Sequence, residues 1–216
     1  VVFFAFTQSG RGVVDRALGI EFDAGREISS CIKNNEVITN KINVILSQGG
    51  SNNPDNFYMF NSTKIEYLCY TSEYYKTCLI QRPLIIQHIE SEIKKEINPE
   101  LKECAEFAKK QAELRGYTTT AGNFNSEIDI TSNKIIIKII YPLAINKDGK
   151  TQNYNEGFDV QLKSEIYQLI MVSTSILNYE SIYGDSDPAI YMGYYPNNRV
   201  EKIKRGDGTT VYKLSD

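Results

Sequence analysis

The sequence predicts an α+β fold, with a long N-terminal amphipathic helix and further helices packed on a mostly antiparallel sheet. Apolar residues recur at helical spacing in some stretches, and other stretches are rich in β-branched and aromatic residues. The two kinds come in blocks, without the regular strand–helix alternation of a parallel sheet. At 216 residues, 41% of them apolar and 24% charged, the composition is typical of one globular domain. We assign this domain to residues 21–216, after an N-terminal segment at 1–20.

The N-terminal segment opens with an apolar run that has no evident place in the predicted domain. Its large side chains are Val1, Val2, Phe3, Phe4 and Phe6. The run is too short to cross a bilayer, which takes about 20 residues, and a globular protein rarely exposes such a run. Two interpretations follow: the stub of a membrane anchor or signal segment, or a strand-like assembly segment that is buried against a partner.

Helical periodicity predicts helices over four ranges, namely 21–47, 84–97, 99–114 and 165–179. Gly49-Gly50 ends the first helix, because glycine has the backbone freedom that a C-cap needs. Pro83 suits a first helical position, and Asn98-Pro99 is expected to separate the second helix from the third. The fourth helix has a broad apolar arc, which predicts deep burial.

Strand composition predicts the sheet, over 57–60, 64–71, 127–131, 134–141, 154–160, 189–195 and 199–214. Short turns join several of these strands, which favours antiparallel pairing. Asp148-Gly149 is the strongest of the turn signals, because this dipeptide suits a two-residue hairpin.

The cysteines bear on the cellular compartment. Four cysteines allow three pairings if all are oxidised. We favour Cys69–Cys78 within a hairpin and Cys31–Cys104 between two helices. The alternative is four reduced thiols in a reducing compartment. The even number and the hairpin spacing favour disulfides, and therefore a location outside the cytoplasm.

Charge and motifs argue against several functions. The net charge is −3 and the basic residues are scattered, so we expect no nucleic-acid partner. His88 is the only histidine and no C-x-x-C motif occurs, so we expect no metal site and no cofactor. The acidic loop at 184–188 is interpreted as a turn rather than a calcium loop, and Glu127 and Asp129 as a solvated strand face. The chain carries no nucleophile signature, and we predict that it is not an enzyme.

Two further features are candidates for surface roles. Asn61 begins an Asn-Ser-Thr glycosylation acceptor, which has meaning if the protein is exported. Tyrosine is favoured at interfaces because it buries a large area and keeps a polar tip, although ordinary sheet packing explains tyrosine equally well. The candidate interface tyrosines are Tyr70, Tyr74, Tyr75, Tyr191, Tyr194 and Tyr195.

A resemblance rests on the order of several short motifs. They are Cys31 on a helix that ends in 48–50 (Gln-Gly-Gly), a cysteine-paired Tyr-rich hairpin, 101–104 (Leu-Lys-Glu-Cys), 141–143 (Tyr-Pro-Leu) and 158–160 (Phe-Asp-Val) before a helix. Over about residues 21–180 this order resembles small archaeal surface proteins of nanoarchaeal and related lineages. The resemblance implies archaeal origin, export and one N-terminal membrane helix, of which this chain has only the stub at 1–6.

Together these features predict a structural subunit of an extracellular surface appendage or filament. Its partners are copies of itself, joined through the apolar segment Val1–Phe6. The alternative is a monomeric adhesion or binding domain of the cell surface, held at the membrane by an N-terminal anchor. Both place the protein outside the cell or at its surface.

Overall fold

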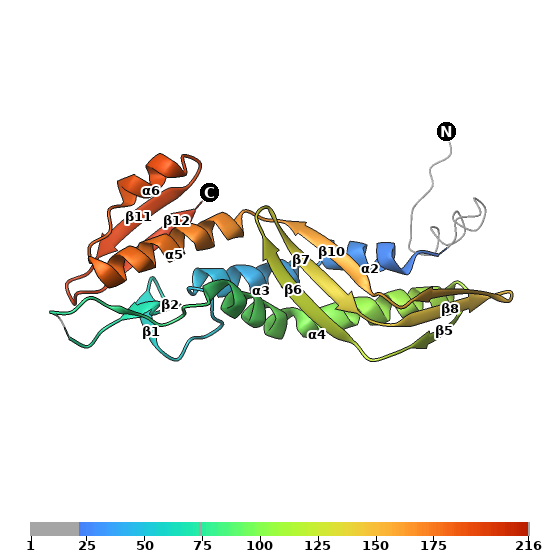
Figure 1. Ribbon diagram of the computed structural model, residues 1–216. Coiled ribbons are helices and arrows are strands. Elements are labelled where there is room, and N and C mark those ends of the chain that lie inside the picture. Colours follow the sequence, from blue (N-terminus) through green and yellow to red (C-terminus); the bar gives the residue numbers. More distant parts are fainter. Residues whose placement is uncertain (1–21, 74, 216) are drawn as a thin grey trace, which may run out of the picture. The chain divides into compact units, whose positions relative to one another are not determined.

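The computed structural model describes residues 22–73 and 75–215 (Figure 1). The apolar segment Val1–Phe6 and Tyr74 lie outside the described residues. The described elements are α2 (Ala24–Lys33), α3 (Glu36–Ser47), β1 (Phe57–Phe60), β2 (Thr63–Glu66), β3 (Cys69–Tyr70), β4 (Leu79–Ile80), α4 (Ile85–Leu114), β5 (Thr118–Ala121), β6 (Asn125–Thr131), β7 (Lys134–Ile140), β8 (Leu143–Lys147), β9 (Lys150–Tyr154), β10 (Phe158–Lys163), α5 (Ile166–Ile182), α6 (Pro188–Tyr194), β11 (Arg199–Lys204) and β12 (Thr210–Ser215).

These elements confirm the α+β class. The strands form several small sheets, with the orders β1-β2, β3-β4, β5-β8-β9, β10-β7-β6 and β11-β12. The registers of the first, second, third and last of these are antiparallel. The chain divides into two compact units, and α4, β6, β7 and β10 contribute to both. A single domain over residues 21–216 stays a prediction.

Unit 1 consists of the residues up to Asn35, Asn98–Glu127 and Lys138–Val160. The disulfide Cys31–Cys104 joins α2 to α4 in this unit. The turn between β8 and β9 is the predicted Asp148-Gly149 hairpin, in which both residues have positive φ (51° and 80°). That geometry is the type I′ turn that Asp-Gly favours.

Unit 2 consists of Glu36–Ile97, Ile128–Ile137 and Gln161–Asp216. It contains the disulfide Cys69–Cys78 and a small core between α5, α6 and the β11–β12 hairpin, formed by Val172, Ile176, Tyr191 and Val200, with Tyr212 and Leu214 packed against it. Unit 2 also carries the groups considered below as a candidate site.

The long N-terminal helix predicted over 21–47 is wrong, because the structure has two helices there. Asn34 caps α2, and its backbone N–H donates to Ser30, while the N–H of Asn35 donates to Ile32. Asparagine favours helix ends because its short polar side chain competes for backbone groups. Lys33 in the last turn of α2 and Glu36 in the first turn of α3 also suit the helix dipoles on either side of this break.

The predicted break at Asn98-Pro99 is also wrong, since α4 continues through Pro99. A proline inside a helix costs about 3 kcal/mol. Against this cost stands one continuous buried stripe along α4, and each buried isoleucine or leucine contributes about 1.5–3 kcal/mol. The stripe consists of Ile89, Ile93, Ile97, Leu101, Cys104 and Ala108. A break at Pro99 would take half of this stripe out of line.

The strand predicted over 189–195 is instead the short helix α6. Asp187 caps it, and its carboxylate accepts the backbone N–H of Ala189, while Pro188 occupies the first turn. This Asp-Pro pair is a helix-start signal, which the strand prediction from the tyrosine-rich composition did not use. Strand β5 had no counterpart among the predicted strands.

Candidate functional site

Helix α5 leaves large apolar side chains in solvent at its C-terminal end. Val172 and Ile176 are buried in the core of unit 2, whereas Ile182 is 64% exposed and Tyr183 is 72% exposed. The rings of Tyr179 and Tyr183 pack together, with centroids 5.0 Å apart. The predicted burial of the helix over 165–179 holds for its inward residues. Ile182 and Tyr183 lie beyond that predicted range.

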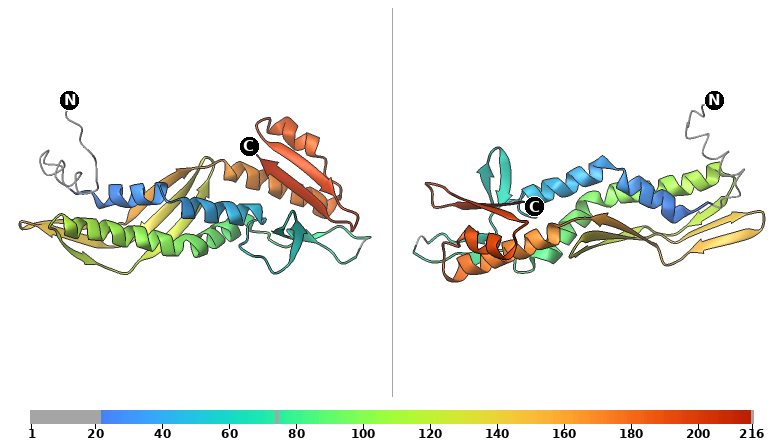
Figure 2. Two further views of the ribbon diagram at one scale, coloured as in Figure 1. Left: turned by 180° about the vertical axis from the view of Figure 1, so that it is seen from behind. Right: turned by 90° about the horizontal axis from the view of Figure 1, so that it is seen from above.

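The disulfide hairpin β3–β4 packs against α5 and adds to the same end of unit 2. Leu79 is 72% exposed, Tyr70 is also exposed, and the rings of Tyr67 and Tyr70 are 5.5 Å apart. The segment between β2 and α4 lies beside the C-terminal end of α5 in all three views (Figures 1 and 2). We define the α5 surface as the exposed side chains of Tyr70, Leu79, Tyr179, Ile182 and Tyr183.

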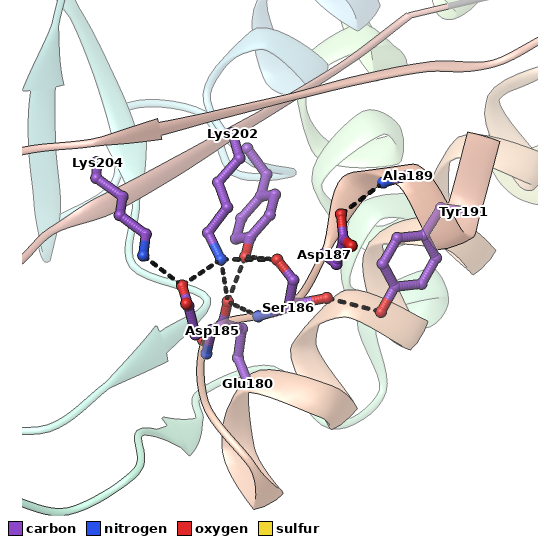
Figure 3. Close-up of polar contacts among 9 residues, drawn as sticks. Glu180, Asp185, Ser186, Asp187, Ala189, Tyr191, Lys202 and Lys204 are labelled. Carbon is purple, nitrogen blue, oxygen red and sulfur yellow. Dashed lines mark hydrogen bonds and ion pairs between the residues drawn. The ribbon is translucent and has the colours of Figure 1, made fainter. Parts of the chain in front are cut away.

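The end of α5 is fixed by polar contacts with the loop that follows it (Figure 3). The Glu180 carboxylate accepts the backbone N–H groups of Asp185 and Ser186, both at 2.9 Å, and the hydroxyl of Tyr212. Burial by itself would raise the pKa of Glu180, but these hydrogen bonds and the nearby Lys202 ammonium lower the pKa below its usual value. Burial and the neighbouring Glu180 raise the pKa of the Tyr212 hydroxyl.

The acidic loop at 184–188 is a structural turn. The carboxylate of Asp185 lies 2.7 Å from the ammonium of Lys202 and 2.6 Å from that of Lys204. These two contacts, that of Lys202 foremost, lower the pKa of Asp185 to about 2. Asp187 caps α6. The carboxylates of the loop are thus engaged within the chain, and the described residues contain no group of three or more His, Cys, Asp or Glu that could hold a metal ion.

A second polar cluster surrounds His88, the only histidine. The hydroxyl of Ser51 lies 2.7 Å from Nε2 of His88 and donates to Glu66 at 2.5 Å. Arg82 donates to the other oxygen of Glu66 through Nε and a terminal nitrogen, at 2.8 and 2.5 Å. Ser51 and Glu66 are buried.

This cluster lacks the geometry of a serine nucleophile with its base. In such a triad the acid orients the imidazole from the nitrogen opposite the serine. Here Glu66 lies on the serine side of the imidazole, 3.7 Å from Nε2 of His88. Its carboxylate accepts a hydrogen bond from the Ser51 hydroxyl. The contacts join the loop after α3, strand β2 and helix α4.

The predicted interface tyrosines that the structure describes lie in two parts of unit 2. Tyr70 and Tyr75 are exposed on the disulfide hairpin and its loop, and Tyr194 and Tyr195 are exposed at the end of α6. Tyr191 is buried, with its hydroxyl 2.8 Å from that of Ser186. Sequence reasoning missed Tyr179, Ile182 and Tyr183, although their helical i, i+3, i+4 spacing is a signal that could have found them.

The remaining predicted residues lie at the surface or in the disulfides. Asn61 is exposed at the β1–β2 turn, where it and Ser62 have positive φ. Glu127 and Asp129 are exposed and alternate with buried residues along β6. All four cysteines are in the two favoured disulfides. Disulfides indicate an oxidising environment. Among the described helices, none has the length and apolar character of a membrane span.

Comparisons with models of protein families, with curated proteins and with solved structures find no match. The fold and the site define the class of the protein: a two-disulfide α+β protein of an oxidising environment. Its most distinctive surface is the aromatic and aliphatic α5 surface on unit 2.

Proposed function

We propose that the chain is a structural subunit of an extracellular surface appendage or filament, and that it assembles with copies of itself through Val1–Phe6. The observation that carries this proposal is the α5 surface, where five large side chains are exposed on adjoining elements. Covering apolar area contributes about 25 cal/mol per Å², and Tyr is enriched at interfaces. Contacts between two different surfaces of one chain build rings or open filaments, and the proposed assembly is an open filament.

Location outside the cytoplasm follows from the same proposal. The two disulfides fit an oxidising compartment, and Asn61 stands exposed on a turn, where a glycan would extend into solvent. We place the subunit at the surface of an archaeal cell, in line with the small archaeal surface proteins that its motif order resembles.

The proposed role is non-catalytic. The Ser51–Glu66–His88 contacts support it because they use the serine proton and the histidine nitrogen within the fold. The carboxylates of Glu180 and Asp185 are likewise held by Lys202 and neighbouring groups. A net charge of −3 with scattered basic residues argues against a nucleic-acid partner.

A second candidate function is a monomeric adhesion domain held at the membrane by an N-terminal anchor. The observation that favours it is the exposure of Tyr75 on the disulfide loop and of Tyr194 on α6. Exposed tyrosines suit binding of a protein or glycan partner. In this case Val1–Phe6 only anchors the chain, and the tyrosines do the binding.

Negative-stain electron microscopy of the full chain beside a variant without residues 1–7 separates the two candidates. Regular fibres that disappear with the truncation support the filament subunit. Dispersed particles in both samples contradict it and leave the anchored binding domain. Fibres in both samples contradict assembly through Val1–Phe6.

A further inference from the structure

We infer that the α5 surface is the acceptor for the apolar segment Val1–Phe6 of a second copy of the chain. This inference rests on the proposed function and deepens it, because it names the surface at the other side of the contact. The α5 surface consists, as defined above, of Tyr70 and Leu79 on the disulfide hairpin, of Tyr179 and Ile182 on α5, and of Tyr183 at the C-cap of α5.

The chemistry of the two surfaces matches. Val1–Phe6 is the longest uninterrupted apolar run in the sequence, and no side chain in it, or among the five of the α5 surface, carries a charge at neutral pH. Burial therefore requires no desolvation of ionised groups, whose removal from water is costly. Phenylalanine against tyrosine also allows the tilted and edge-on ring contacts that aromatic pairs prefer.

The dimensions match as well. Six residues in extended conformation span about 20 Å, and the 17 residues of α5 rise about 26 Å in total. A segment of this length can therefore contact both the exposed end of α5 and the adjoining hairpin, whereas the last turn of α5 alone would cover only about a quarter of it.

The acceptor is fixed before any partner arrives. The disulfide Cys69–Cys78 closes the hairpin, and Glu180 ties the last turn of α5 to Ser186 and Tyr212. Side chains that are held in place lose less entropy on binding, so a preorganised surface binds more tightly than a mobile one. This separates the α5 surface from Leu114 on α4, a single exposed side chain at the end of a helix.

Insertion of Val1–Phe6 from a second copy fits the α5 surface better than a symmetric contact between the α5 surfaces of two copies. Joining the α5 surfaces of two copies would be an isologous contact that closes as a dimer and leaves Val1–Phe6 uncovered. Inserting Val1–Phe6 of one copy into the α5 surface of the next covers both apolar features and leaves one of each at the two ends. Such a head-to-tail contact builds an open filament when its rotation does not close a ring.

The first test replaces two exposed acceptor side chains in the full chain, as Ile182→Ser with Tyr183→Ser. Both are solvent-exposed, so the fold is expected to persist, which the circular dichroism spectrum and melting temperature check. We expect at least a tenfold loss of fibre mass at a fixed concentration. The matched control is Leu114→Ser, which removes a side chain of similar exposure (70%) in unit 1 and should assemble as the parent does. Unchanged fibres in the double variant would overturn the inference.

The second test uses disulfide trapping, because all four native cysteines are already paired. A copy with Ala5→Cys is mixed with a copy carrying Ile182→Cys and oxidised. The expected product is a covalent pair of the two different copies, with Leu114→Cys as the control that does not cross-link to Ala5→Cys. Cross-links that form only between two Ile182→Cys copies would overturn the inference. A single chain that carries both Ala5→Cys and Ile182→Cys would overturn it as well, if it cross-links only within itself.

The two failures are distinguishable. If removal of residues 1–7 leaves fibres intact, the proposed function fails. If that truncation abolishes fibres while the Ile182 and Tyr183 changes do not, the filament function stands and only the acceptor assignment fails.

Discussion

The carboxylate of Asp185 lies 2.7 Å from the ammonium of Lys202, and this contact joins the loop after α5 to strand β11. Lys202 is itself largely buried and also donates to the carbonyl of Ser186. Its position is therefore fixed by the fold, whereas Asp185 reaches it from the solvent side. The contact stabilises the loop that ends α5, directly beside Ile182 and Tyr183.

We expect Asp185→Asn to lower the melting temperature slightly at pH 7, and this difference from the parent to shrink on acidification. Lys202 and Lys204 hold the pKa of Asp185 at about 2, below its ordinary value. A depressed carboxylate pKa contributes stability above the unfolded pKa, and this contribution is lost as pH falls through the folded pKa. The window is thus from about pH 4 to about pH 2. Thermal unfolding at several pH values measures it.

Asp129→Asn is the control for the removal of an exposed carboxylate, because Asp129 is exposed on β6. A difference between Asp185→Asn and the parent that persists unchanged down to pH 2 would contradict the assigned cause.

Tyr212→Phe removes a donor to Glu180 without changing the packed ring. We expect a loss of about 1–2 kcal/mol in the free energy of unfolding, because a partly buried carboxylate loses a hydrogen bond. The pKa of Glu180 should rise, since that hydrogen bond is one of the causes that lower it. Urea denaturation gives the first quantity. Tyr183→Phe, at an exposed tyrosine, is the control and should change stability little; equal losses in the two variants would refute the role of Glu180.

The sequence predicts the α+β class and the disulfide Cys69–Cys78 because both depend on local spacing, and Cys31–Cys104 is then the remaining pair. Strands separated by short turns pair with each other, and Cys69 and Cys78 are close enough in sequence to be joined in one hairpin. The predicted helix break at Pro99 and the predicted strand at α6 are wrong for different reasons. At Pro99 the helix continues despite the proline, because the buried stripe of α4 stabilises it. At α6 the strand was predicted from tyrosine composition, and the helix-start signal of Asp187-Pro188 was not used.

The α5 surface could be predicted only in part. Periodicity identifies which side chains of α5 are apolar, but it carries no information on which neighbouring element covers each of them. The sequence placed the helix over 165–179 in the core and made no prediction for Ile182 or Tyr183. The structure covers Val172 and Ile176 and leaves Ile182 and Tyr183 exposed. Which face lacks a neighbour is decided by tertiary contacts between elements far apart in the chain.

Gly157 is expected to be intolerant of any side chain. Its φ is +85°, and a Cβ built there lies 2.2 Å from the carbonyl oxygen of Ile139. Gly149 has a similar φ of +80° but open space around it. Gly149→Ala should therefore cost about 1 kcal/mol for the backbone conformation alone. Gly157→Ala should cost clearly more, because the backbone must also move. Equal costs by urea denaturation would show that the close approach to Ile139 is relieved without penalty.

Removing each disulfide in turn should distinguish its effect on the free energy of unfolding from its effect on fibre formation. In the chain-entropy model, the sequence separations of 73 for Cys31–Cys104 and 9 for Cys69–Cys78 correspond to about 4 and about 3 kcal/mol. Paired alanine substitutions at Cys31 and Cys104 should therefore lower the free energy of unfolding more. Those at Cys69 and Cys78 should reduce fibre formation more, because this disulfide holds the hairpin that presents Tyr70 and Leu79.

Unfolding by urea and fibre yield by sedimentation measure the two effects at a temperature where both variants are folded. The opposite order of fibre yields, with the Cys31–Cys104 variant impaired and the Cys69–Cys78 variant assembling as the parent does, would contradict a role for the hairpin in the contact. The comparison is informative because the variant with the larger loss of stability is expected to assemble better, so that a general effect of destabilisation cannot produce the predicted result.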